Sequence, residues 1–76
     1  MYHTIEFTVD ATVALEISPK HWQEQVLIEK GSRLRVQTRP YVVEIDDQLV
    51  EVADLFLEDG TATRMVPFES FSFVDE

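Results

Sequence analysis

The sequence predicts an all-β protein, in which five or six short antiparallel strands form a small, partly open barrel with at most one or two short helical turns. Apolar and polar residues alternate along most of the chain, which is the period of a half-buried strand. Glycine, proline and paired aspartates separate the alternating stretches at short intervals, as turns do. The length of 76 residues predicts a single domain over residues 1–76.

The first strand signal runs from Ile5 to Ile17, where apolar side chains occupy the odd positions. One straight strand of this length would span about 43 Å at roughly 3.3 Å per residue, which is too long for a domain of this size. The segment therefore either folds back through a three-residue loop at residues 10–12, with Ile5 opposite Ile17, or bends strongly as one strand. The sequence leaves both alternatives open.

Ser18 and Pro19 end this segment. Serine is a good helix N-cap and proline suits the first helical position, so a short helical turn is predicted over residues 19–24. A short apolar run at residues 26–28 then leads to a tight turn at Gly31, because glycine readily adopts a positive φ.

Residues 33–38 form the next predicted strand, with Leu34 and Val36 on its buried face. Pro40 separates this strand from another at residues 41–45. A two-residue turn at Asp46 and Asp47 joins the latter to the strand that starts at Gln48. The resulting hairpin has one consistent apolar face, which consists of Tyr41, Val43, Ile45, Val50 and Val52.

After Ala53 the apolar positions change from even to odd numbers, which predicts a β-bulge. Residues 48–58 also fit an amphipathic helix, because Leu49, Val52 and Phe56 recur at helical spacing. The abundance of valine, leucine and phenylalanine favours the strand, and the helix stays as the alternative.

A three-residue loop at residues 58–60 with a left-handed Gly60 returns the chain along residues 61–66. This register pairs Leu55 with Thr63 and places Met65 on the same face.

Pro67 ends that strand. Phe68 and Phe71 are three residues apart, which is the spacing of a single 3₁₀ turn. Phe71 and Phe73 then alternate in a last short strand. All three phenylalanines are predicted to lie in the core.

Two segments resemble parts of SH3-like small β barrels. Residues 26–36 resemble the stretch in which a glycine turn leads into a central strand, and residues 64–71 resemble the late strand, the proline-led 3₁₀ turn and the last strand. The resemblance implies the barrel fold only. It does not imply binding of proline-rich peptides, because the entry segment is aliphatic and Trp22 precedes the glycine turn.

The composition disfavours catalysis and cofactor binding. The chain has no cysteine and only two histidines, His3 and His21, whose spacing matches no metal-binding pair. Two isolated glycines do not form a phosphate-binding loop. The sequence therefore predicts no enzyme, no cofactor and no metal site.

Net charge and hydropathy limit the classes of partner and the cellular location that we expect for this protein. Fifteen acidic against six basic residues give a formal net charge of −9, which disfavours direct contact with nucleic acid. No apolar run is long enough to span a membrane and no leader-like segment opens the chain, so the protein is predicted to be cytoplasmic.

The basic residues Arg33, Arg35 and Arg39 lie close together in the chain and are followed by Tyr41. Arginine and tyrosine are enriched at interface hot spots, so these four residues are candidates for a partner-binding face. The structural alternative is that the arginines pair with acids of a neighbouring strand. Trp22 is either a lid on one end of the barrel or an exposed binding anchor.

Taken together, these features predict a non-enzymatic protein-interaction module or small accessory subunit whose partner is another protein or a second copy of the chain. The alternative is an acidic DNA mimic, in which the carboxylates between Glu44 and Asp59 occupy the basic groove of a nucleic-acid-binding protein.

Overall fold

The computed structural model describes residues 1–17 and 22–74, except for the side chains of residues 17, 22 and 23. These residues form seven strands and one 3₁₀ helix. The elements are β1 (His3–Phe7), β2 (Ala11–Ile17), β3 (Trp22–Ile28), β4 (Arg33–Ile45), β5 (Gln48–Leu57), β6 (Thr61–Pro67), η1 (Phe68–Ser70) and β7 (Phe71–Phe73). The all-β prediction is confirmed, with seven strands instead of five or six.

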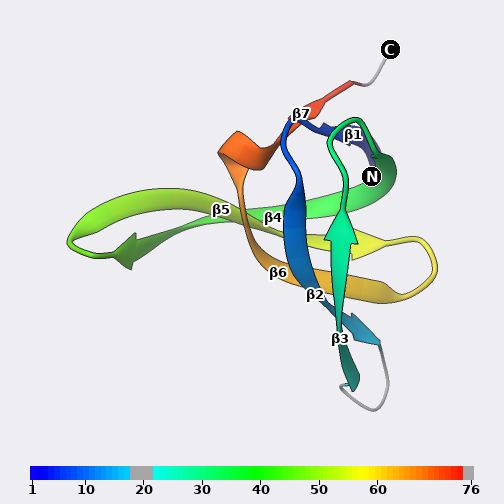
Figure 1. Cartoon of the computed structure of the whole chain (residues 1–76), viewed down its shortest axis with the longest axis horizontal. Helices are drawn as coiled ribbons and strands as arrows, with labels where there is room; N and C mark the ends of the chain where they lie inside the picture. The colour runs from blue at the N-terminus through cyan, green and yellow to red at the C-terminus, as the bar shows by residue number, and fades with distance from the viewer. Residues whose placement is uncertain (18–21, 75–76) are drawn as a thin grey trace.

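The strands form one antiparallel sheet in the order β3-β2-β6-β5-β4-β1-β7, which curls into a half-barrel (Figure 1). The concave side, here called the inner face, holds the core; the opposite side is the outer face. The core cluster consists of Ile5, Phe7, Ile28, Val36, Ala53, Leu55, Val66 and Phe71.

The first apolar segment forms two strands that are not neighbours in the sheet. β1 pairs with β4 and β7, whereas β2 pairs with β3 and β6, so neither alternative for residues 5–17 is right: the segment is neither a hairpin nor one bent strand. The chain leaves strand conformation at residues 8–10, where the Asp10 carboxylate accepts a hydrogen bond of 2.7 Å from the Lys30 amide. Both strands turn their odd residues toward the core, so alternation alone could not separate them.

β3 begins at Trp22, which is paired with Ile17 of β2. The helical turn predicted over residues 19–24 is therefore wrong for residues 22–24, and its remainder lies outside the described residues.

β4 runs without a break through Pro40, so the predicted separation into two strands is wrong. β1 accompanies β4 only as far as Val36; from residue 37 onward, β5 is its one neighbour among the described strands. Proline has no N–H to donate and is tolerated at such an edge.

The predicted turns at residues 46–47 and 58–60 are confirmed. Ile45 pairs with Gln48 across a two-residue turn whose Asp46 and Asp47 have left-handed φ angles of 50° and 63°. Residues 48–57 form a strand and not the alternative helix. At the next turn, Gly60 has a φ of 92°.

A register shift is present between Ala53 and Leu55, but the extra residue lies in β6. The bulge predicted within β5 is therefore wrong, since β5 pairs with β4 without a shift. Leu55 pairs with Thr63, but Ala53 pairs with Val66, so one residue of β5 faces two of β6 at this point. Met65, one of those two, has a φ of 56° and is 49% exposed. Its predicted place on the buried face of Leu55 is therefore wrong.

The end of the chain follows the prediction closely, since Pro67 is followed by η1 and then β7. Phe71 is buried and Phe68 packs against the core cluster. Phe73 is 48% exposed, so its predicted core position is wrong. β7 lies at the edge of the sheet, so that within residues 1–17 and 22–74 no further strand borders Phe73 on that side.

Candidate interaction surface

Residues 42–51 form a two-stranded ribbon that projects from the half-barrel and is here called the arm (Figure 1). β1 stops pairing with β4 at Val36, and β6 pairs with β5 only from Val52 onward. Among the described strands, the arm thus has no neighbour on either edge. A two-stranded ribbon alone in water is marginally stable, so an arm of this kind gains from a covering partner.

Large apolar side chains are exposed on both faces of the arm. Val42 is 56% exposed and Leu49 is 78% exposed, and both continue the inner face outward. Ile45, which is 46% exposed, lies on the outer face. The predicted apolar face of this hairpin is thus buried at its base, where Val52 is 1% exposed, and open at its tip. Adjacent exposed apolar residues on a protruding element mark interaction sites.

A groove of about 480 Å³ lies between the arm and η1. Leu49 and Phe68 supply its apolar lining, and Glu51 and Glu69 supply carboxylates. The residues before Val52 line it because no strand covers β5 there.

The predicted partner-binding residues of β4 share the outer face. Arg33, Arg35 and Arg39 are exposed and Tyr41 is half-buried, and they alternate along one side of the strand. Arg39 and Tyr41 lie at the base of the arm, whereas Arg33 and Arg35 lie beside β1.

Two of these arginines pair with acids next to β4 in the sheet. Arg33 Nε is 2.9 Å from the Glu6 carboxylate of β1, and Arg35 Nε is 3.9 Å from Glu58, which follows β5. Exposed pairs of this kind contribute little stability. Arg39 has no ionic partner among the described residues, which leaves its charge available to a partner.

Tyr41 is held in place by a buried carboxylate that sequence analysis missed. Asp54 is 5% exposed. It accepts hydrogen bonds from the Tyr41 hydroxyl at 2.7 Å, from Arg64 at 3.0 Å and from the Met65 amide at 3.1 Å. The bulge in β6 allows this last contact, because it turns the Met65 N–H toward Asp54.

Burial acts to raise the pKa of Asp54, but the hydrogen bonds from Tyr41, Met65 and Arg64 outweigh it and hold the pKa below the ordinary value of 3.8. The hydrogen bond to Asp54, together with burial, raises the pKa of Tyr41. The carboxylate is therefore ionised and the phenol neutral near pH 7.

Arg64 extends this network across the outer face. Its guanidinium lies 3.5 Å from the Glu16 carboxylate of β2 and 5.3 Å from the centre of the Phe56 ring. Side chains from β2, β4, β5 and β6 thus fix the surface beside Tyr41. The sequence offers one indication that Asp54 is buried, namely that it is a single acid within an otherwise apolar stretch of β5. An acid at such a position is nevertheless more often exposed.

Trp22 is not placed beside the arginines by the sheet order. Its strand, β3, is separated from β4 by three other strands. Its side chain lies outside the described residues, so neither the lid nor the anchor interpretation is tested.

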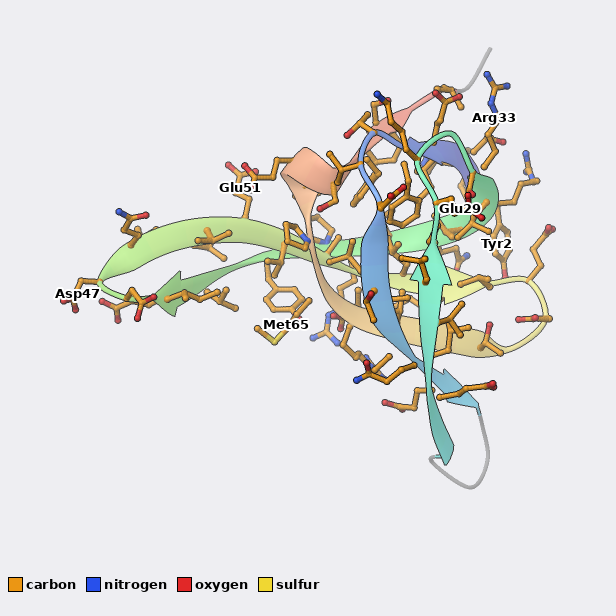
Figure 2. The ribbon with its side chains drawn as sticks, in the orientation of Figure 1. Tyr2, Glu29, Arg33, Asp47, Glu51 and Met65 are labelled. Carbon is orange, nitrogen blue, oxygen red and sulfur yellow. The ribbon has the colours of Figure 1, made fainter. Side chains whose placement is uncertain are left out.

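A second hollow, of about 530 Å³, lies beside β1 and is lined by Tyr2, His3, Arg33 and Arg35, among others. Figure 2 shows Tyr2 and Arg33 on the same side of the molecule, away from the arm. The His3 ring makes an edge contact with Phe73 at 5.6 Å. Both arginines that line this hollow have carboxylate partners, whereas Arg39 at the base of the arm has no ionic partner among the described residues.

Within residues 1–17 and 22–74, no three histidine, aspartate or glutamate side chains converge as a metal site would require. None of the helical segments described in the structure has the length and apolar character needed to cross a bilayer.

Comparison of the chain with known protein families, curated proteins and solved structures gives no match. The function is therefore argued from the geometry of the chain itself.

Proposed function

We propose that this protein is a non-enzymatic interaction module, or small accessory subunit, that binds another protein through the arm and the adjoining outer face of β4. The observation that carries the proposal is the arm itself, with Leu49 78% and Val42 56% exposed on a ribbon that no other described strand borders. Burying one such side chain fully contributes about 1.5 to 3 kcal/mol, so a partner that covers several has a substantial driving force.

The base of the arm adds groups suited to specific recognition. Arg39 carries an unpaired charge, and Tyr41 is oriented by its hydrogen bond to Asp54. An anchor that is already ordered loses little conformational entropy on binding. Arg33, Arg35 and Trp22 extend the proposed surface less directly, since the two arginines are paired with carboxylates and the strand of Trp22 is distant in the sheet.

We also infer that the half-barrel is a variant of the SH3-like fold. The inference is supported by the turn at Gly31, which leads into β4, and by the succession of β6, Pro67, η1 and β7. This inference concerns the fold alone and implies nothing about which ligand the protein binds.

The DNA-mimic alternative receives less support from the placement of the carboxylates. Glu44 and Glu51 lie on the inner face of the ribbon, whereas Asp54 is buried on the outer face and paired with Arg64. A phosphate mimic needs its carboxylates exposed on one surface, so the interaction module is the better-supported function.

The proposal is tested by affinity capture from cells that produce the protein naturally. We expect Leu49→Ser and Arg39→Glu to lose the protein that the unaltered chain enriches. Leu27→Ser and Lys30→Glu are matched controls, because Leu27 is also exposed, at 60%, and both residues lie outside the arm. Thermal unfolding of each variant must stay close to that of the unaltered chain. Equal capture by all four variants would contradict the proposal.

A second copy of the chain is the other predicted partner, and sedimentation across a range of concentrations tests it. A dimer formed through the arm would become monomeric in Leu49→Ser and not in Leu27→Ser. A monomer mass at every concentration would rule this partner out.

A further inference from the structure

The groove between the arm and η1 continues the core outward. Leu49 lies on the same face of β5 as Ala53 and Leu55, which are fully buried, yet it is 78% exposed. Phe68, on the other wall, packs against the core cluster with part of its surface open. The groove thus has an apolar lining that is anchored in the folded domain.

Carboxylates surround this apolar lining. Glu51 and Glu69 line the groove, and Glu44, Asp46 and Asp47 lie on the arm beside it. All five are exposed and none has an ionic partner among the described residues. The sequence has no lysine or arginine between Arg39 and Arg64, so no cation of the arm offsets this charge.

A second copy of the chain does not fit this groove well. Two arms in contact would bring their carboxylates together in a molecule whose net charge is already −9. Arg33, Arg35 and Arg64 are engaged with carboxylates of their own chain, so the described residues of a second copy offer only Arg39 and Lys30 against these five carboxylates. Charge complementarity therefore favours a different, cationic protein.

We propose that the groove between the arm and η1 binds a segment of another protein in which lysine or arginine side chains flank apolar ones. The apolar side chains contact Leu49 and Phe68, and the cations lie against Glu51, Glu69 and the tip of the arm. This inference rests on the proposed function and specifies the chemistry of its partner.

The test uses three labelled peptides of equal length: one of lysine and leucine, one in which glutamate replaces every lysine, and one in which serine replaces every leucine. Binding to the full chain is measured by fluorescence anisotropy, and the contact surface is mapped by amide chemical shifts. We expect the lysine–leucine peptide to bind with shifts at Leu49, Glu51 and Phe68. The glutamate peptide should not bind, and the serine peptide should bind at least about tenfold more weakly.

Charge-reversed variants distinguish the effect of a charge at the groove from the effect of the net charge of the whole molecule. Glu51→Lys and Glu29→Lys change the net charge equally, but Figure 2 shows Glu51 on the arm and Glu29 on the other side of the molecule. We expect about tenfold weaker binding for Glu51→Lys, because an attraction becomes a repulsion, and less than about a twofold change for Glu29→Lys.

Equal weakening by both variants, shifts confined to another surface, or equal binding of the glutamate peptide would each overturn the inference. If affinity capture depends on Leu49 but is indifferent to Glu51→Lys, the interaction module stands and its cationic partner does not. If capture depends on neither residue, the proposed function itself fails.

Discussion

Asp54 offers the sharpest test of the network that orders the base of the arm. Replacing it with alanine removes an acceptor from three donors, namely the Tyr41 hydroxyl, the Arg64 guanidinium and the Met65 amide. Arg64 can turn to water because its side chain is 45% exposed, so the cost should lie at the lower end for a broken buried pair, about 3 kcal/mol. For a domain of this size that corresponds to a fall in Tm of about 18 °C.

Asp54→Asn removes the negative charge of the side chain but keeps its size and shape, so it measures the contribution of the charge to stability. The amide oxygen can still accept from Tyr41 and Met65, but the amide NH₂ then faces Arg64, so we expect about half the loss seen for alanine. Because hydrogen bonds hold the pKa of Asp54 below 3.8, its stabilising effect is complete above that pH and is lost as the pH falls further. The difference in Tm between the unaltered chain and Asp54→Asn should therefore shrink below pH 3.8.

The assay is thermal unfolding followed by circular dichroism, at pH 7 and at several values below pH 4. Glu29→Gln is the control, because Glu29 is exposed and has no ionic partner among the described residues. Its effect should stay within about 0.5 kcal/mol at every pH. An Asp54→Asn difference that does not change with pH would refute the argument that the ionised carboxylate stabilises this site.

Three further predictions concern other parts of the sheet. Thr63 is 1% exposed and its hydroxyl has no hydrogen-bond partner among the described residues, so Thr63→Val should raise the Tm by about 6 °C, equivalent to about 1 kcal/mol; a lower Tm in thermal unfolding would contradict this. Asp47 has a φ of 63°, which glycine adopts without strain, so Asp47→Gly should stabilise the chain by about 0.5 kcal/mol, unless equilibrium denaturation shows a loss. Tyr41 should ionise above 10.0, so the tyrosinate signal that Tyr41→Phe removes from a spectrophotometric titration should have its midpoint above pH 10.0; a midpoint at or below pH 10.0 would contradict this.

The charged part of the candidate surface was accessible to sequence analysis, and its apolar part was not recognised. Alternation along β4 places Arg33, Arg35 and Arg39 on one solvated face, as predicted. Leu49 is not part of the apolar face predicted for the hairpin, and its exposure could not be predicted because hydrophobicity does not reveal whether a covering element exists. The adjacent apolar residues Val42 and Val43 could have indicated this exposure. They point to opposite faces of the strand, and a strand with only one buried face leaves one of them exposed.

The turns at residues 46–47 and 58–60, and the strand registers across them, followed from the sequence alone. Such turns depend on the backbone preferences of a few neighbouring residues, which can be inferred from the residue types alone. Examples are the left-handed Asp46 and Asp47, the loop that ends at Gly60 and the 3₁₀ turn after Pro67.

The tertiary structure decided what depends on distant contacts. It separated β1 from β2, carried β4 through Pro40 at an uncovered edge, and buried Asp54 among donors from two other strands. A strand's alternation specifies which side chains share a face, but not which strand lies next to it or whether anything covers that face. Both properties depend on the packing of the whole sheet, which in this protein leaves the arm without a neighbour among the described strands.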